Sequence, residues 1–144
     1  IYCLILMNKQ KKIKLFWKII NHLNKKFCKN KLQIRKLILF RKGDMHRSFP
    51  HRQGWYLSDT KQLLINRKEP LILQIIILIH EFTHAYQWQF MGKYYNRKAD
   101  KLKLLGKPEE EFYSSMDKVF HDKKSKKIYQ MFLKESDKII KISV

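Results

Sequence analysis

Hydrophobic residues recur at helical spacing near the start of the chain. Lysines occupy one face of residues 11–27, and apolar side chains occupy the other, at Ile13, Phe16, Trp17, Ile20 and Leu23. This spacing predicts an amphipathic helix that packs its apolar face on a core. A helix lying on a membrane surface is the alternative that the same pattern allows.

Three short apolar runs after this helix predict strands. Residues 37–40 form an uninterrupted apolar run, which is typical of a buried strand. Residues 55–57 and 62–66 flank a short polar segment and predict two strands of a hairpin. Residues 41–54 are predicted to form a polar loop between the first strand and the hairpin.

The longest apolar segment predicts a buried helix over residues 71–91. The nine residues 71–79 are apolar except for Gln74, which predicts burial around the whole circumference of this half. Pro70 suits the start of a helix, and Gly92 stands where the helix would end. A membrane span is excluded, because it needs about 20 mostly apolar residues and the polar His80 arrives too early.

Further helices are predicted in the last third of the chain. Pro108 opens one helix with three glutamates in its first turn, and residues 124–142 form a last amphipathic helix. The connection over residues 92–107 is predicted to be irregular or partly helical. We therefore predict an α+β fold over residues 1–144, a single domain in which a short β-sheet precedes a buried helix and C-terminal helices.

The composition is that of a globular domain. The chain has 144 residues, 44% hydrophobic and 13% aromatic, which is enough to bury a core. Cys3 and Cys28 form no disulfide framework or metal-binding spacing, so a reducing, cytoplasmic compartment is expected. Because the chain begins with Ile1 and its first methionine is Met7, we allow that residues 1–6 are not part of the native protein.

The net charge of +20 has two interpretations. A strongly basic surface favours contact with nucleic acid, because lysine and arginine neutralise phosphates. Alternatively, 26 of the 32 basic residues are lysines spread along the chain, as expected of an AT-rich genome. Arginine, which reads phosphates and base edges better, occurs six times. We favour the compositional interpretation, with non-specific nucleic-acid contact as a by-product.

The long helix contains the sequence His-Glu-Phe-Thr-His at residues 80–84. Residues four apart share one helix face, so His80 and His84 can bind one metal ion. A catalytic zinc site needs three protein ligands and an open position for water, beside which Glu81 can accept a proton. The motif predicts a zinc-dependent hydrolase, and a chance match on an inert helix is the alternative.

The motif, and its place after a small sheet, resemble the zincin metallopeptidases. The resemblance covers roughly residues 37–121 and implies hydrolysis of peptide bonds, with His80 and His84 as zinc ligands and Glu81 as general base. The extended motif of the metzincins is absent, because Gln87 and Phe90 stand where that motif has glycine and histidine.

The third ligand has to come from elsewhere in the chain. Small gluzincin-type peptidases take it from a downstream helix, and residues 109–113 resemble their Glu-x-Glu-small-aromatic stretch. This resemblance implies Glu111, although Phe112 stands where a small residue is usual. Glutamates in a first helical turn also offset the helix dipole without any metal. Three other residues stay open as the third ligand: Glu110, Asp100 and His121.

Two other functions also stay open. The SprT-like zincins are DNA-associated proteases whose third ligand is a histidine, and the His84-Ala85 pair and the basic charge fit that group. Their usual histidine-glycine pair is absent, because Asp122 follows His121. The other function is a non-catalytic basic module that binds nucleic acid. An active enzyme would also need a donor for the oxyanion, and the candidates are Tyr95, Tyr113 and His121.

Overall fold

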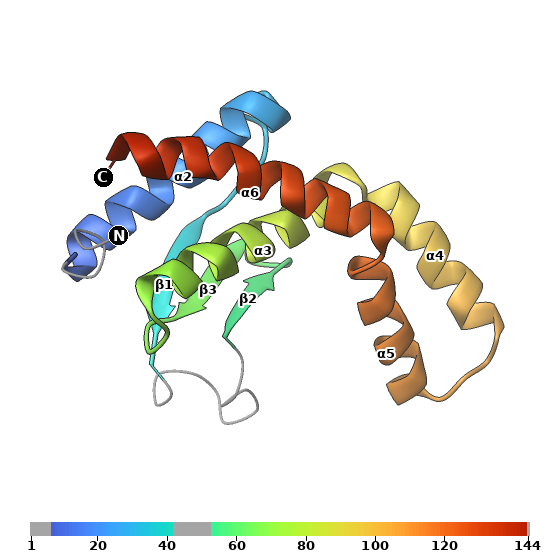
Figure 1. Ribbon diagram of the computed structural model, residues 1–144. Coiled ribbons are helices and arrows are strands. Elements are labelled where there is room, and N and C mark those ends of the chain that lie inside the picture. The colour runs from blue at the N-terminus through green and yellow to red at the C-terminus, as the bar shows by residue number, and fades with distance from the viewer. Residues whose placement is uncertain (1–6, 42–52, 144) are drawn as a thin grey trace.

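Three strands form a mixed sheet in the computed structural model, which describes residues 7–41 and 53–143. β1 (Lys36–Phe40) runs parallel to β3 (Gln62–Asn66), and β2 (Gly54–Leu57) runs antiparallel to β3. The strand order is β1-β3-β2, so β2 forms one edge of the sheet (Figure 1).

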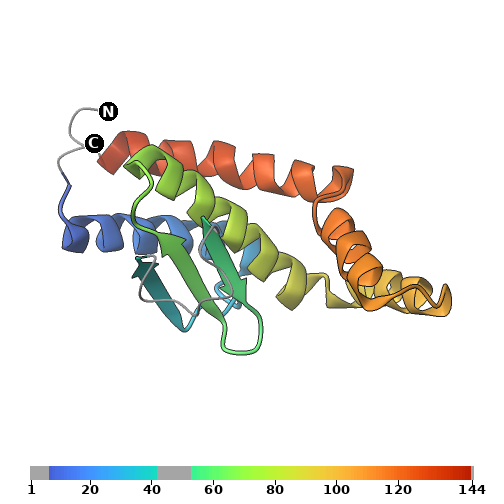
Figure 2. The same cartoon turned by 90° about the horizontal axis from the view of Figure 1, so that it is seen from below.

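The helix α3 (Leu71–Phe90) lies between the sheet and α6 (Lys123–Ser143), which also packs along α2 (Lys9–Cys28) (Figures 1 and 2). The core between these elements is built from the apolar sides of all three helices and of the sheet. α2 begins at Asn8, whose side chain accepts a hydrogen bond from the Lys11 amide at 2.9 Å, as an N-cap residue does.

The burial of α3 is less complete than the sequence predicted. Ile72 and Ile76 are 45% and 36% exposed, so the expectation of burial around the whole circumference was wrong. The physical reason is that the sheet covers one side of α3 and α6 covers another, and among the described residues no element packs along the remaining face.

Two helices extend away from this body as a hairpin (Figure 1). α4 (Gly92–Leu104) follows α3 after a turn at Met91, where φ is −120° and the helix is interrupted. The connection predicted as irregular or partly helical is thus mainly a helix. α5 (Glu109–Phe120) packs against α4, and the chain then turns into α6.

The coarse predictions of the sequence analysis are confirmed. The fold is α+β, and the first helix, the three strands, the hairpin and the helix after Pro108 all form where they were expected. Cys28 is a free thiol buried in the core, whereas Cys3 and most of the predicted loop 41–54 lie outside the described residues. No described helix is both long and apolar enough to cross a membrane.

Candidate metal centre

The uncovered face of α3 carries both histidines of the motif. Four-residue spacing puts Ile72, Ile76, His80 and His84 in one row along the helix. The first two are exposed and the histidines are half-buried, because rings from the end of α5 and from α6 contact their imidazoles. The two imidazoles line a cleft rather than packing in the core.

A third histidine, His121 at the end of α5, completes a cluster. The Nε2 atom of His80 lies 3.1 Å from Nε2 of His84 and 3.3 Å from Nε2 of His121. One ligand atom of each of the three histidines lies within 4.8 Å of those of the other two. Among the described residues, these three could hold a metal ion.

The two separations measured from His80 fit a pair of ligands on one tetrahedral ion. Two nitrogen ligands with bonds of about 2.0–2.1 Å and a tetrahedral angle between them lie about 3.3–3.4 Å apart. The distances of 3.1 and 3.3 Å around His80 are close to that value. The donor set of three imidazoles leaves a fourth position open.

Burial keeps two of the imidazoles in the neutral form that binds metal. Burial, with a smaller effect of the neighbouring His80 and His121, lowers the pKa of His84 to about 4, although the hydrogen bond with Gln87 raises it. Burial is also the main cause that lowers the pKa of His80. At neutral pH both rings thus carry a lone pair, which metal binding requires.

The orientation of His121 is set by a main-chain contact. Its Nδ1 lies 2.7 Å from the carbonyl oxygen of Asp117, which can only accept a hydrogen bond. Nδ1 therefore carries the proton and Nε2 is left with its lone pair, directed at the other two histidines. A hydrogen bond to the remote ring nitrogen is the usual support of a metal-binding histidine.

A cleft of about 600 Å³ opens in front of the cluster. The edge strand β2 contributes Gly54 and Trp55 to the lining, and the rest comes mainly from the length of α3 and the end of α5. Glu81 lines this cleft next to His80 although its side chain is largely buried, at 7% exposure. Three imidazoles and two carboxylates, of Glu81 and Asp117, thus line one cleft that is large enough for part of a peptide.

The structure does not bring Glu111 to the histidines. Glu111 is exposed in the first turn of α5, and His121 is at the other end of that helix. The ten-residue step from Glu111 to His121 corresponds to roughly 15 Å along the helix axis. Glu110 and Asp100 are likewise exposed and outside the cluster. His121, which the sequence left as an open alternative, occupies the third position.

The structure also distinguishes among the three candidate oxyanion donors, because only one of them lies at the cleft. Tyr113 is 61% exposed on α5 and does not line the cleft, and the hydroxyl of buried Tyr95 is hydrogen-bonded to Ser125 at 2.9 Å. His121 remains at the cleft as a member of the cluster. Tyr129, which the sequence analysis missed, lines the cleft with its ring centroid 5.7 Å from that of His80. In the sequence, Tyr129 was marked out only by lying in the amphipathic helix predicted over residues 124–142.

No protein-family model matches this chain, and comparisons with curated proteins and with solved structures found no match.

Proposed function

We propose that His80, His84 and His121 bind a zinc ion and that the protein is a metal-dependent hydrolase of peptide bonds. The observation that carries the proposal is a cluster of three imidazoles in which Nε2 of His80 lies 3.1 Å from Nε2 of His84 and 3.3 Å from Nε2 of His121, close to the separation of two ligands on one tetrahedral ion. Three protein ligands with an open position are typical of catalytic rather than structural zinc sites.

The choice of zinc follows from the donor set. Imidazole nitrogen suits zinc, copper, iron and nickel, whereas calcium and magnesium prefer oxygen ligands. Zinc has no geometric preference of its own and accepts the tetrahedral arrangement that the three histidines favour. When bound, zinc supplies a Lewis acid that polarises a carbonyl group and acidifies water.

Glu81 is the general base of this proposal. Its carboxylate lines the cleft beside the ligands, where an oxygen can take a proton from the attacking water and pass it to the nitrogen of the leaving amine. The partial burial of Glu81 limits competing contacts with bulk water. The resemblance to zincins assigns the same role to this residue. In that superfamily, as here, a small sheet precedes the motif helix along the chain.

Zinc content and peptide hydrolysis test the proposal together. Purified protein reconstituted with zinc should hold about one ion per chain, and His80→Ala should lose it. Glu81→Gln should keep the zinc and lose hydrolysis of an unstructured protein such as casein. Wild-type protein that holds no zinc after reconstitution would refute the metal site, and an active Glu81→Gln variant would refute the assigned base.

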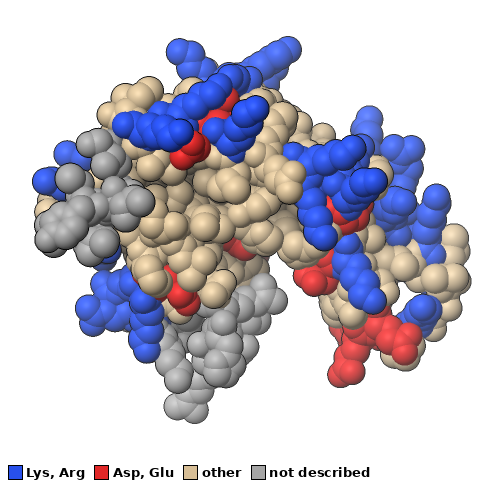
Figure 3. All heavy atoms as spheres, in the orientation of Figure 1, with Lys and Arg blue, Asp and Glu red and all other residues tan. Residues whose placement is uncertain are grey.

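A DNA-associated protease is the second candidate, and two observations favour it. The third position is held by a histidine, as in the SprT-like zincins, rather than by a glutamate. Lysines and arginines gather over α4 and the first half of α6 on the face shown in Figure 3. Within that group Lys98 and Lys124 lie 5.5 and 4.5 Å from the ring of Tyr94, which joins two helices into one basic surface.

The response to DNA separates the two candidates. A DNA-associated protease should cleave faster when single-stranded DNA is added, and the log of its DNA affinity should fall linearly with log salt. A general peptidase should not respond to DNA. DNA binding that survives removal of zinc in a protein without hydrolysis would instead identify a non-catalytic basic module.

A further inference from the structure

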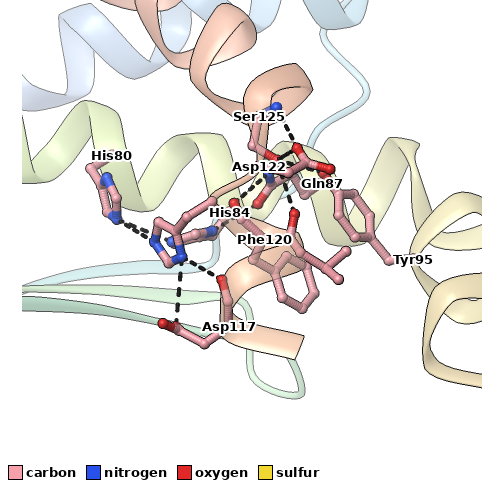
Figure 4. Close-up of polar contacts among 10 residues, drawn as sticks. His80, His84, Gln87, Tyr95, Asp117, Phe120, Asp122 and Ser125 are labelled. Atoms are coloured by element: carbon pink, nitrogen blue, oxygen red, sulfur yellow. Dashed lines mark hydrogen bonds and ion pairs between the residues drawn. The ribbon is translucent and has the colours of Figure 1, made fainter. Parts of the chain in front are cut away.

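One buried side chain joins the proposed ligands of α3 to the turn between α5 and α6, residues 120–125, which carries the third proposed ligand. We call this turn the corner. Gln87 is fully buried, with 0% exposure, one turn after His84. Its Oε1 lies 2.7 Å from Nδ1 of His84. Its Nε2 donates to the carbonyl of Phe120 at 3.0 Å and to Oγ of Ser125 at 2.6 Å. A single amide thus contacts α3, the end of α5 and the first turn of α6 (Figure 4).

These contacts fix which way the amide faces. The carbonyl of Phe120 can only accept a hydrogen bond, so the nitrogen of the Gln87 amide must be on that side. The oxygen must then face His84. Because this oxygen can only accept, Nδ1 of His84 must carry the proton, and Nε2 keeps the lone pair that points at the cluster.

The corner on the other side of the amide determines where His121 lies. Phe120 immediately precedes His121, and Ser125 is anchored to the same turn because its amide and hydroxyl both donate to Oδ1 of Asp122, at 2.9 and 2.8 Å. The hydroxyl of Tyr95 in α4 adds a further contact to Ser125 at 2.9 Å. Movement of this corner would carry His121 away from the two histidines of α3.

We propose that Gln87 is a positioning residue of the metal centre: it fixes the tautomer of His84 and ties that ligand to the corner that carries His121. This inference rests on the proposed metal site and goes beyond it, because neither the histidine motif nor the ligand set assigns any role to Gln87. Remote hydrogen bonds of this kind typically contribute about 10–100-fold to metal affinity.

The first test uses metal-free wild-type protein and needs no variant. Nitrogen NMR of histidine side chains at pH 7 should show His84 protonated at Nδ1 and unprotonated at Nε2. In Gln87→Glu the carboxylate still accepts from Nδ1, so the tautomer should be preserved. In Gln87→Leu the acceptor is lost, and the Nε2-protonated tautomer should appear. A wild-type His84 protonated at Nε2 would overturn the proposal.

The second test measures zinc affinity by competition with a chromophoric chelator. Gln87→Leu should bind zinc about 10–100-fold more weakly than wild type. Gln87→Glu should lie between them, because it supports His84 but cannot donate to the carbonyl of Phe120. The matched control is Gln74→Leu, since Gln74 is a second buried glutamine of α3, 1% exposed, that bonds the carbonyls of Arg67 and Glu69 away from the cluster. It should lower the thermal stability and leave zinc affinity unchanged.

The two tests distinguish this inference from the proposed function. Equal zinc affinity of Gln87→Leu and wild type would overturn the positioning role and leave the metal site standing. A wild-type protein that binds no zinc would refute the proposed function and this inference with it. An equal loss of affinity in Gln74→Leu and Gln87→Leu would also overturn the inference, because the effect would then follow from general destabilisation.

Discussion

His80 and His121 meet through their Nε2 atoms, 3.3 Å apart, although 41 residues separate them in the chain. His80 lies in the middle of α3, and His121 is the residue at which α5 ends. The helix hairpin of α4 and α5 leads the chain away from the body and returns it to the end of α3 (Figure 1). The cluster of three histidines is therefore completed by tertiary structure and not by the local motif.

We predict that His121→Ala weakens zinc binding far more than Glu111→Ala. Removal of His121 takes away a direct ligand, so the loss should exceed the roughly 100-fold upper range of indirect contacts. Glu111 is exposed at the far end of α5, and its removal should leave affinity unchanged. Zinc titration against a chelator measures both variants. Retained binding in His121→Ala with a loss in Glu111→Ala would instead support the gluzincin-type ligand set.

Most of the helices, the hairpin and the pair of histidines on α3 could be predicted from the sequence, because each depends only on the spacing of nearby residues. Periodicity placed α2, α3 and α6, and the turn residues placed the hairpin of β2 and β3. That His80 and His84 share one face of α3 follows from the helical repeat alone. The position of Glu81 beside them follows from the same helix.

The remainder of the site depends on contacts between distant segments. Glu111 was predicted from a resemblance of five residues, but a helix of fixed rise carries it away from the end where α5 meets α3. His121 had no sequence signal beyond being a histidine. The place of Gln87, two turns after His80 on the same helix face, allows either a hydrogen bond near the metal or a place in the cleft lining, and only the folded structure shows that its amide joins three elements.

We predict that Gly54→Ala destabilises the protein and slows hydrolysis. A Cβ at Gly54 would overlap Cγ2 of Ile77 and lie 3.0 Å from the carbonyl oxygen of Leu64 and 3.3 Å from Cγ of Glu81. Overpacking of this kind costs about 1–3 kcal/mol. Because β2 or Glu81 must shift, the rate of peptide cleavage should fall as well. Urea unfolding and a peptide assay measure the two effects.

The matched control for Gly54→Ala is the same substitution at Gly92, the first residue of α4. Apart from its chain neighbours and its own helix backbone, no described residue has an atom within 4 Å of a Cβ built there, so Gly92→Ala should leave activity unchanged and stability equal or slightly higher. Equal behaviour of the two variants would show that the close approach of β2 to α3 at Gly54 has no energetic or catalytic consequence.

We predict that Phe132→Ala is among the most damaging core substitutions. Phe132 is fully buried, and its ring lies 5.2–5.4 Å from those of Phe27, Phe82 and Tyr86, so it joins α6 to α2 and α3. Truncation of a buried phenylalanine costs about 3–5 kcal/mol. The adjacent Met131 is 42% exposed, and Met131→Ala should change stability by about 0.5 kcal/mol or less. A similar cost for both variants in urea unfolding would contradict this packing.

A last prediction concerns stability in acid, which depends on Glu135 of α6. Its Oε1 lies 2.9 Å from both His22 Nε2 and Lys26 Nζ of α2, and its Oε2 lies 3.1 Å from Lys138 Nζ. Hydrogen bonds from His22 and Lys26 lower the pKa of Glu135 from 4.5 to about 2. The folded state thus binds this proton less readily than the unfolded state.

The sign of the pH dependence follows from that difference. The stabilisation by Glu135 is complete above about pH 4.5 and is lost as the pH falls toward about 2. Glu135→Gln should be less stable than wild type at pH 6, and the difference should shrink between pH 4.5 and 2. Asp137→Asn is the control, because Asp137 is exposed and its ion pair with Lys141 at 3.0 Å lies at the surface, where such pairs contribute little. A constant difference between wild type and Glu135→Gln across this range, measured by urea unfolding, would show that the ion pairs of Glu135 do not link α6 to α2 energetically.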